Sequence, residues 1–87
     1  MRMKDQLDLT NHRIWKDKNI KAEAKEIYSY LYAEALDKVV AHISIGRIQS
    51  LFSITNVGFK NNLKLLEKYK YLVFKEYNNG LYEYHIY

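Results

Sequence analysis

The sequence predicts an α+β fold in which three helices are followed by a C-terminal two-stranded β-hairpin. Three observations carry this prediction. Apolar residues recur every three or four positions over residues 20–36, 45–52 and 56–69, which is the period of an amphipathic helix. From Tyr71 onward the apolar residues alternate, which is the period of a strand. An Asn-Asn-Gly sequence, typical of a turn, divides that last stretch in two.

The length and composition suit one domain with a single core. The chain has 87 residues, of which 48% are hydrophobic, enough for a compact interior. We expect residues 1–19 to form an N-terminal arm and residues 20–87 to form the domain. The bulky pair Ile14 and Trp15 predicts that the arm docks by Trp15, or forms a short strand or a turn of helix. Pairing of the arm with a second subunit is the alternative.

The first predicted helix covers residues 20–36, where good helix formers are dense and no breaker interrupts them. Its apolar face comprises Ala24, Ile27, Tyr28, Leu31 and Ala35. The next segment, Val39–Ile43, is short, apolar and rich in β-branched residues. It predicts a small strand or an extended connector.

Two hydroxyl side chains mark the starts of the next two helices. Ser44 is the predicted N-cap of a helix over residues 45–52, and Thr55 that of a helix over residues 56–69. A tight turn at residues 53–54 separates these helices. The buried stripe of the second helix comprises Ile45, Ile48 and Phe52.

The third helix has two opposite faces when its residues are placed about 100° apart. The apolar face comprises Phe59, Leu63 and Leu66. The opposite face comprises Val57, Lys60, Asn61, Lys64 and Lys68. An apolar back and a basic, amide-bearing front are what a helix that enters a DNA groove needs.

The predicted hairpin joins strands 71–77 and 81–87 by a three-residue loop that ends in Gly80, in the left-handed conformation. The resulting register pairs Leu72 with Ile86 and Phe74 with Tyr84 on the core face, and Lys75 with Glu83 outside. A two-residue turn would instead set Glu76 opposite Glu83, so cross-strand charge favours the longer loop.

The positive charge is concentrated in one stretch. The net charge is +4, but residues 1–37 hold seven Lys/Arg and seven Asp/Glu, whereas residues 38–70 hold six Lys/Arg and only Glu67. A basic patch attracts a polyanion through phosphate contacts and counterion release. The alternative is an ordinary solvated helix face.

Other classes of protein find little support. The chain has no cysteine, which excludes disulfides and thiolate zinc sites. No apolar run approaches the roughly 20 residues of a membrane span, and the first residues are charged rather than apolar. The histidines His12, His42 and His85 lack metal-ligand spacing, and no glycine-rich phosphate loop or nucleophile elbow is present. We therefore expect a cytoplasmic protein that is no enzyme and takes no cofactor, metal, membrane or small-molecule substrate.

The run 43–72 resembles a bacterial winged helix-turn-helix DNA-binding domain. The matching positions are the apolar anchor Ile48, the turn Ile54-Thr55, the apolar pair Phe59 and Leu63, and the pair Leu66-Glu67. The run 24–31 is similar to the first helix of the winged domains of plasmid and phage replication proteins. The resemblance covers residues 20–87. The chain departs from the usual pattern at Gly58, commonly Thr or Ser, and at Lys70, where a glycine often precedes the wing.

The resemblance implies that the third helix lies in the major groove of double-stranded DNA and that the hairpin, the wing, touches the flanking backbone or minor groove. Asn61 is the first candidate for reading a base, while Lys68 and Lys70 are also explained by the helix dipole. The packing interpretation of Gly58 is favoured over close approach to DNA. The predicted DNA-binding residues are Ser44, Arg47, Thr55, Asn56, Val57, Lys60, Asn61, Lys64, Lys75, Asn78 and Asn79.

The expected function is that of a DNA-binding homodimer of a plasmid, phage or other mobile element, acting in replication initiation, segregation or transcriptional regulation. The rival hypothesis is a winged-helix protein-interaction module, or a small phage inhibitor of a host protein, without DNA binding. A third hypothesis is a protein that binds single-stranded nucleic acid, whose bases would stack on Tyr71, Tyr77, Tyr82 and Tyr87. Aromatic residues on a hairpin more often pack across strands or cover a partner, so cross-strand packing or a subunit interface is favoured over stacking.

Overall fold

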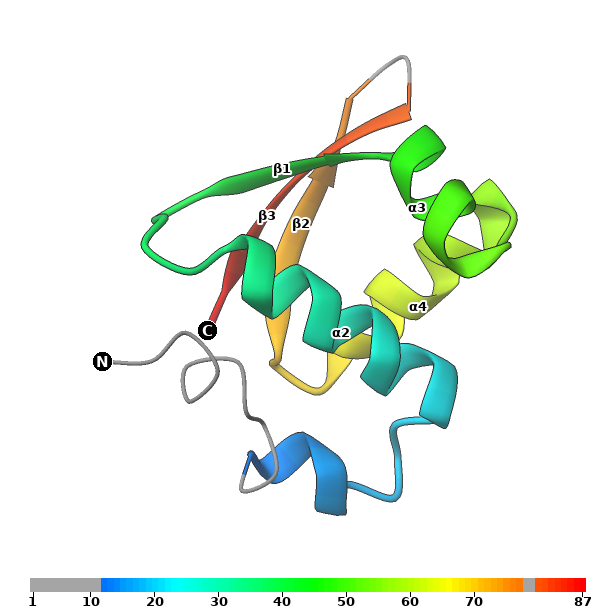
Figure 1. Ribbon diagram of the computed structural model, residues 1–87. Helices are drawn as coiled ribbons and strands as arrows, with labels where there is room; N and C mark the ends of the chain where they lie inside the picture. The colour runs from blue at the N-terminus through cyan, green and yellow to red at the C-terminus, as the bar shows by residue number, and fades with distance from the viewer. Residues whose placement is uncertain (1–11, 78–79) are drawn as a thin grey trace.

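The computed structural model describes residues 12–77 and 80–87, so part of the predicted arm and the wing residues Asn78 and Asn79 lie outside the described residues. The described elements run in the order helix, strand, helix, helix, strand, strand after one short 3-10 turn (Figure 1). They are η1 (Arg13–Lys16), α2 (Ala22–Glu34), β1 (Ala41–Ser44), α3 (Ile45–Phe52), α4 (Asn56–Lys68), β2 (Leu72–Glu76) and β3 (Leu81–Ile86). The predicted α+β class is confirmed.

The two predicted hairpin strands form with the expected register. Leu72 pairs with Ile86, Phe74 with Tyr84 and Lys75 with Glu83. Gly80 has a φ of 73°, as the three-residue loop requires. A side chain at Gly80 would also meet Ile45, because its Cβ would lie 2.5 Å from the Ile45 Cγ2. The glycine therefore serves both the turn and the contact between the hairpin and α3.

The sheet has a third strand, so the expectation of a two-stranded sheet was incomplete. β1 pairs antiparallel with β3, which gives the order β1-β3-β2. In this pairing Ala41 lies opposite Tyr84 and Ile43 opposite Tyr82. Val39 and Val40 precede the strand and are 79% and 41% exposed. β1 therefore begins at Ala41, two residues after the start of the apolar run at Val39, because the pairing with β3 begins there.

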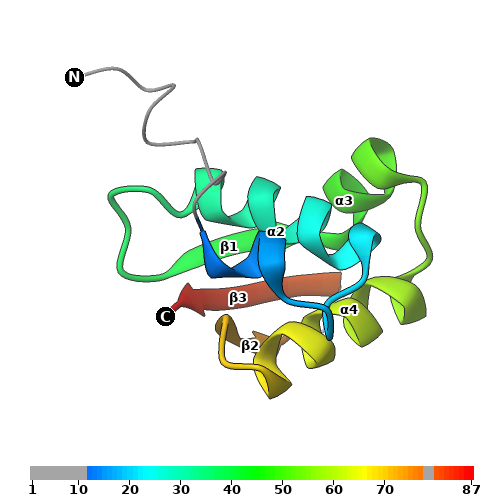
Figure 2. The same cartoon turned by 90° about the horizontal axis from the view of Figure 1, so that it is seen from below.

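One face of the sheet and the apolar faces of the helices form a single core. Apart from Ala35, the predicted apolar faces of α2 and α4 are buried, as is Ile48 of α3. The strands contribute Leu72, Tyr82 and Tyr84, and the Tyr84 hydroxyl donates to the Leu31 carbonyl at 2.8 Å. Figure 2 shows the sheet and α4 from below, with η1 against α2. The predicted stripe residues Ala35, Ile45 and Phe52 lie at the margin of the core, half-buried.

Both predicted N-caps are confirmed. The Ser44 hydroxyl accepts from the Arg47 amide at 3.3 Å, and the Thr55 hydroxyl accepts from the Gly58 amide at 3.0 Å. A Cβ on Gly58 would lie 3.0 Å from Ile54 Cγ1 and 3.1 Å from Thr55 Oγ1. Because Gly58 has no side chain, the first turn of α4 can pack closely on Ile54 and Thr55. This contact supports the packing interpretation of Gly58.

Residues 12–20 pack onto the rest of the domain, but not through the expected side chain. Ile14 is fully buried, whereas Trp15 is 40% exposed, so the prediction of docking by Trp15 was wrong. The Arg13 guanidinium lies 3.9 Å from the centre of the Tyr71 ring, and the Tyr71 hydroxyl donates to Asp17 at 2.7 Å. Adjacent bulky residues on a tight turn point to different sides, so only one of the pair can enter the core.

The docked segment predicts a pH-dependent stability through His12. Burial and the neighbouring Arg13 lower the pKa of His12 below its usual 6.5. The neutral ring accepts from the Ile14 amide through Nδ1 at 3.1 Å and contacts the Tyr28 hydroxyl through Nε2 at 3.1 Å. The stabilisation is therefore complete above pH 6.5 and is lost as the pH falls toward the lowered folded-state pKa.

We expect the urea midpoint to decrease from about pH 7.5 to about pH 5.5, and His12→Ala to reduce that decrease while lowering the midpoint at the higher pH. An identical pH dependence in the variant and the parent protein would show that another group is responsible.

Candidate nucleic-acid interface

α4 presents a polar and basic face to solvent along its whole length. Val57 is 69% exposed, and Asn61, Lys64 and Lys68 are exposed as well. The opposite face is sealed in the core, since Phe59, Leu63 and Leu66 are at most 1% exposed. The predicted division of this helix into an apolar back and a polar front is confirmed. The front is accessible to a large polyanion.

The first two turns of α4 are joined to the hairpin by a polar network. The Lys60 ammonium lies 2.7 Å from a Glu76 carboxylate oxygen. The Tyr82 hydroxyl donates to Asn56 Oδ1 at 2.7 Å and lies 3.4 Å from the other Glu76 oxygen. Sequence reasoning missed Glu76 and Tyr82 as members of this site. The signal was present, because strand alternation places Glu76 on the core face, where a carboxylate needs a partner.

This network changes the roles of two predicted contact residues. Lys60 is half-buried and its charge is offset by Glu76, so the expectation of a free Lys60 is corrected. Asn56 already uses its amide oxygen as an acceptor, which leaves its NH₂ group as the free donor. A bidentate pair with adenine needs both groups. Asn61, which is exposed on the middle of α4, therefore stays the best candidate for that pair.

Three other predicted contact residues, Ser44, Arg47 and Thr55, have local partners. Ser44 and Thr55 are exposed and use one acceptor each for their caps, which leaves the hydroxyl hydrogens available as donors. The Arg47 guanidinium donates from Nε to the Tyr30 hydroxyl and is exposed. That hydrogen bond, followed by charge interactions with Tyr30 and Glu34, raises the pKa of Arg47.

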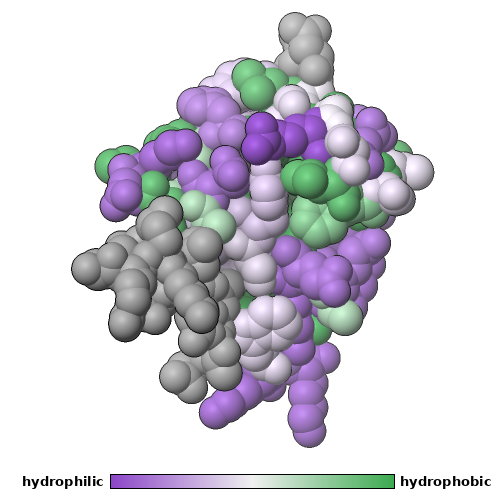
Figure 3. Space-filling model, viewed as in Figure 1, coloured by the Kyte–Doolittle hydropathy of each residue, from purple (hydrophilic) through white to green (hydrophobic). Residues whose placement is uncertain are grey.

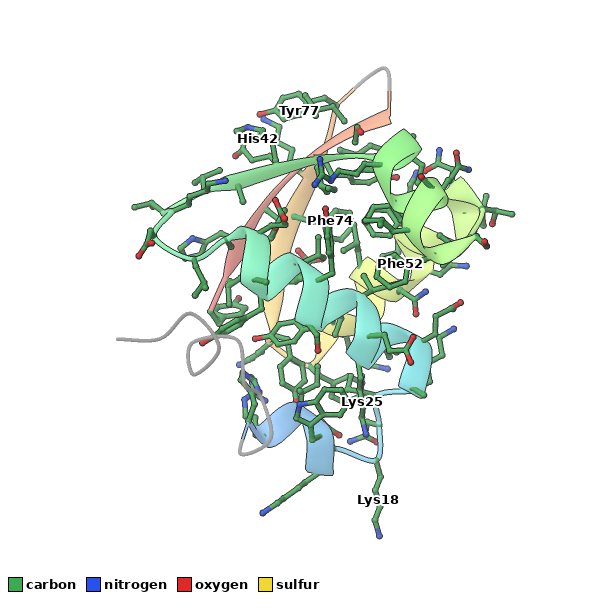
Figure 4. All side chains as sticks on the ribbon, in the orientation of Figure 1. Lys18, Lys25, His42, Phe52, Phe74 and Tyr77 are labelled. Atoms are coloured by element: carbon green, nitrogen blue, oxygen red, sulfur yellow. The ribbon has the colours of Figure 1, made fainter. Side chains whose placement is uncertain are left out.

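Lys75 lies on the wrong side of the sheet for a joint contact with α4. Strand alternation and its pairing with Glu83 place it on the outer face, away from the face that packs on the helices. Its ammonium lies 5.2 Å from the centre of the Tyr77 ring, and the Tyr77 hydroxyl donates to Glu83 at 2.7 Å. Figure 4 shows His42 and Tyr77 close together at this outer face. The structure therefore separates Lys75 from the other predicted contact residues.

The proposed aromatic platform for single strands is contradicted. Tyr71 is 1% exposed and Tyr82 is fully buried, so neither ring is available for stacking on a base. Tyr77 and Tyr87 are exposed, at 38% and 67%, but two scattered rings do not form a platform. Burial also raises the pKa of Tyr71 to about 12, with its hydrogen bond to Asp17 as the second cause.

The described residues show no metal-ligand cluster but do show a small hollow on the sheet. Among residues 12–77 and 80–87, no three His, Asp or Glu side chains are grouped so that they could hold a metal ion. A hollow on the sheet, lined by Val73, Lys75, Glu83 and His85 among others, has a volume of about 130 Å³. Ligand pockets usually measure roughly 300–1,000 Å³. None of the helices that the structure describes has the length and apolarity to cross a bilayer.

Comparisons with family models, with curated proteins and with solved structures found no match to this chain.

Proposed function

We propose that the protein is a winged helix-turn-helix protein that places α4 in the major groove of double-stranded DNA. The observation that carries this proposal is the front of α4, where Asn61, Lys64 and Lys68 are exposed on a helix whose back is anchored in the core. A helix fixed in this way can enter the groove without reorganising the fold. The order of helices and strands, with β1 completing the sheet beside the hairpin, supports a winged arrangement.

The contacts divide by chemistry. Asn61 has both the donor and the acceptor needed to pair with the adenine edge, and Val57 offers an apolar contact to a thymine methyl group. Lys64 and Lys68 reach guanine or phosphates, and the hydroxyls of Ser44 and Thr55 can donate to phosphates at the flank. Specific recognition thus rests on the middle of α4, while affinity comes from the surrounding cations.

The first test is duplex binding by Lys64→Ala. We expect weaker binding at every sequence and a shallower dependence on salt, since one phosphate contact contributes a slope of about 0.9 in log K against log salt. Fluorescence anisotropy with a labelled duplex, repeated at several salt concentrations, measures both quantities.

Lys38→Ala is the matched control, because Lys38 is exposed in the loop between α2 and β1 and its loss changes the net charge equally. Equal affinities and slopes for Lys64→Ala and the parent protein would remove α4 from the interface. If Lys64→Ala weakens binding as expected, selection of bound fragments from random DNA gives the target sequence.

We propose further that two copies bind repeated sites on a plasmid, phage or other mobile element, in replication initiation, segregation or transcriptional regulation. Burial of Tyr71 and Tyr82 weakens the aromatic surface of the hairpin as support for a dimer. The exposed apolar side chains of Val39, Val40 and Tyr87 are the remaining support. The visible face that carries α2 is mostly hydrophilic, with apolar side chains in small separate groups (Figure 3). Sedimentation velocity measures the oligomeric state.

A second candidate function is a winged-helix module that binds a protein. Two observations favour it: Glu76 offsets the charge of Lys60, and Leu51 and Val57 expose 53% and 69% of their surface. Exposed apolar side chains beside a partly neutralised helix suit a protein partner better than a phosphate backbone. This candidate predicts no duplex binding by the parent protein at low salt.

A further inference from the structure

The N-terminal segment brings a second group of cations beside the C-terminal end of α4. The Arg13 guanidinium donates to the Lys70 carbonyl at 2.7 Å, so η1 touches the turn that follows α4. Residues 12–26 hold five Lys/Arg and three Asp/Glu, an excess of two positive charges. The charge balance of residues 1–37 as a whole is zero, so it does not show this local excess.

The segment is held in place by contacts along its length. Ile14 and Ile20 are buried, at 0% and 2% exposure. Tyr71 donates to Asp17 at 2.7 Å, and the Lys25 ammonium donates to the Trp15 carbonyl at 3.3 Å. Charges on such a fixed turn keep their positions relative to α4, so a contact made through them costs little additional ordering.

Two of the three acidic residues of this segment, Asp17 and Glu23, have local partners, and the third, Glu26, is exposed on α2. Asp17 accepts from Tyr71 and lies near Arg13, and the hydrogen bond from Tyr71 is the main reason that its pKa is lowered. Lys21 lies 3.8 Å from Glu23. Lys16 and Lys18 are exposed and account for the remaining positive charge of η1 and its turn. Figure 4 shows Lys18 pointing away from the body of the protein.

The length of α4 places its end near the DNA backbone. Its 13 residues span about 20 Å, whereas the major groove is about 12 Å wide. A helix of this length cannot lie across the groove without its ends approaching the bordering phosphates. Lys68 and Lys70 are exposed at the C-terminal end of α4, where η1 docks.

Resting on the proposed function, we propose that Lys16, Lys18, Lys68 and Lys70 form a second contact surface, the η1 basic surface, that binds the DNA backbone beside the C-terminal end of α4. Lysine ammonium groups at this position provide point charges for phosphates and no base readout. The surface therefore raises affinity for any duplex sequence, and the N-terminal segment acts as part of the DNA-binding surface.

The test compares Lys16→Ala and Lys18→Ala, alone and combined, with Lys38→Ala. The probe is a labelled mixed-sequence duplex of about 30 base pairs, roughly three helical turns. Removing one phosphate-binding lysine lowers the salt slope by about 0.9, which corresponds to roughly eightfold weaker binding at about 0.1 M salt and roughly 60-fold for the double variant. The relative preference among duplex sequences stays unchanged, and circular dichroism melting verifies that the variants fold.

The outcomes separate this inference from the proposed function. Binding that is weakened by Lys64→Ala but equal in Lys16→Ala/Lys18→Ala and Lys38→Ala overturns the η1 basic surface and leaves the assignment of α4 intact. A parent protein that binds no duplex overturns both. A loss of affinity in the double variant with an unchanged salt slope also overturns the inference, because the lysines would then act other than through phosphates.

Discussion

Replacing Leu66 with alanine is expected to lower the free energy of unfolding by about 2–5 kcal/mol. Leu66 is fully buried on the back of α4, within the core cluster formed by α2, α4 and the sheet. Truncation removes its burial and leaves a cavity that the surrounding side chains fill only in part. Since small domains are stable by roughly 5–15 kcal/mol in total, this one change removes a large share of the stability.

Urea unfolding followed by circular dichroism measures this loss. Lys64→Ala is the control on the same helix, since the side chain is exposed and surface changes typically alter stability by no more than about 0.5 kcal/mol. The two variants are expected to behave in opposite ways: Leu66→Ala loses stability and Lys64→Ala loses DNA affinity. A stability loss below about 1 kcal/mol for Leu66→Ala would contradict the packing described for the back of α4.

The Glu76→Gln variant is expected to bind DNA more tightly than the parent protein. Glu76 lies 2.7 Å from the Lys60 ammonium and, in the proposed complex, would compete with phosphates for it. The amide keeps the shape and the acceptor toward Tyr82 but removes the negative charge beside α4. Freeing one cation adds about 0.9 to the salt slope and strengthens binding roughly eightfold at about 0.1 M salt.

The same anisotropy titration tests this gain, with Asp37→Asn as the charge-matched control. Asp37 lies after α2 with a φ of 67°, a conformation that asparagine also adopts readily. Removing its charge is expected to have a much smaller effect, because it lies outside both proposed contact surfaces. Equal gains in DNA affinity for the two variants would mean that only the net charge matters and that Glu76 does not compete with DNA for Lys60.

Elements whose signals are local were predicted well from the sequence. α3 and α4 were recognised by their apolar period and by the caps Ser44 and Thr55, and the hairpin register by Gly80 and cross-strand charge. Each signal lies within a few residues of the structure that it specifies. The front of α4 could be predicted for the same reason, since helical geometry alone separates it from the core face.

Features that depend on residues far apart in the chain were not predicted. The pairing of β1 with β3, the docking of η1 by Ile14 and the ion pair between Lys60 and Glu76 all join segments that only the folded chain brings together. No local period distinguishes a cation that faces water from one that faces a carboxylate on a later strand. The prediction therefore placed the polar front of α4 correctly, but it did not foresee that Lys60 forms an ion pair with Glu76.

The hypothesis of an aromatic platform failed because a phenol ring suits both the interior and the surface, so a count of tyrosines does not show which rings are exposed. Tyr71, Tyr82 and Tyr84 are buried with their hydroxyl groups bonded to Asp17, Asn56 and the Leu31 carbonyl, respectively. The predicted register already placed Tyr84 inside. Tyr82 lies two residues earlier on the same strand, so alternation alone assigns it to the core face as well.

The hydrogen bond from Tyr82 to Asn56 and the contact of Lys60 with Glu76 join α4 directly to the hairpin. In the proposed complex with DNA, any contact made by the hairpin would keep a fixed distance from the groove contact of α4, and a mismatch with the helical repeat would have to be absorbed by bending or twisting the duplex. Sequences with easily deformed pyrimidine–purine steps would incur the smallest elastic penalty, so selectivity would extend to base pairs that no side chain reaches.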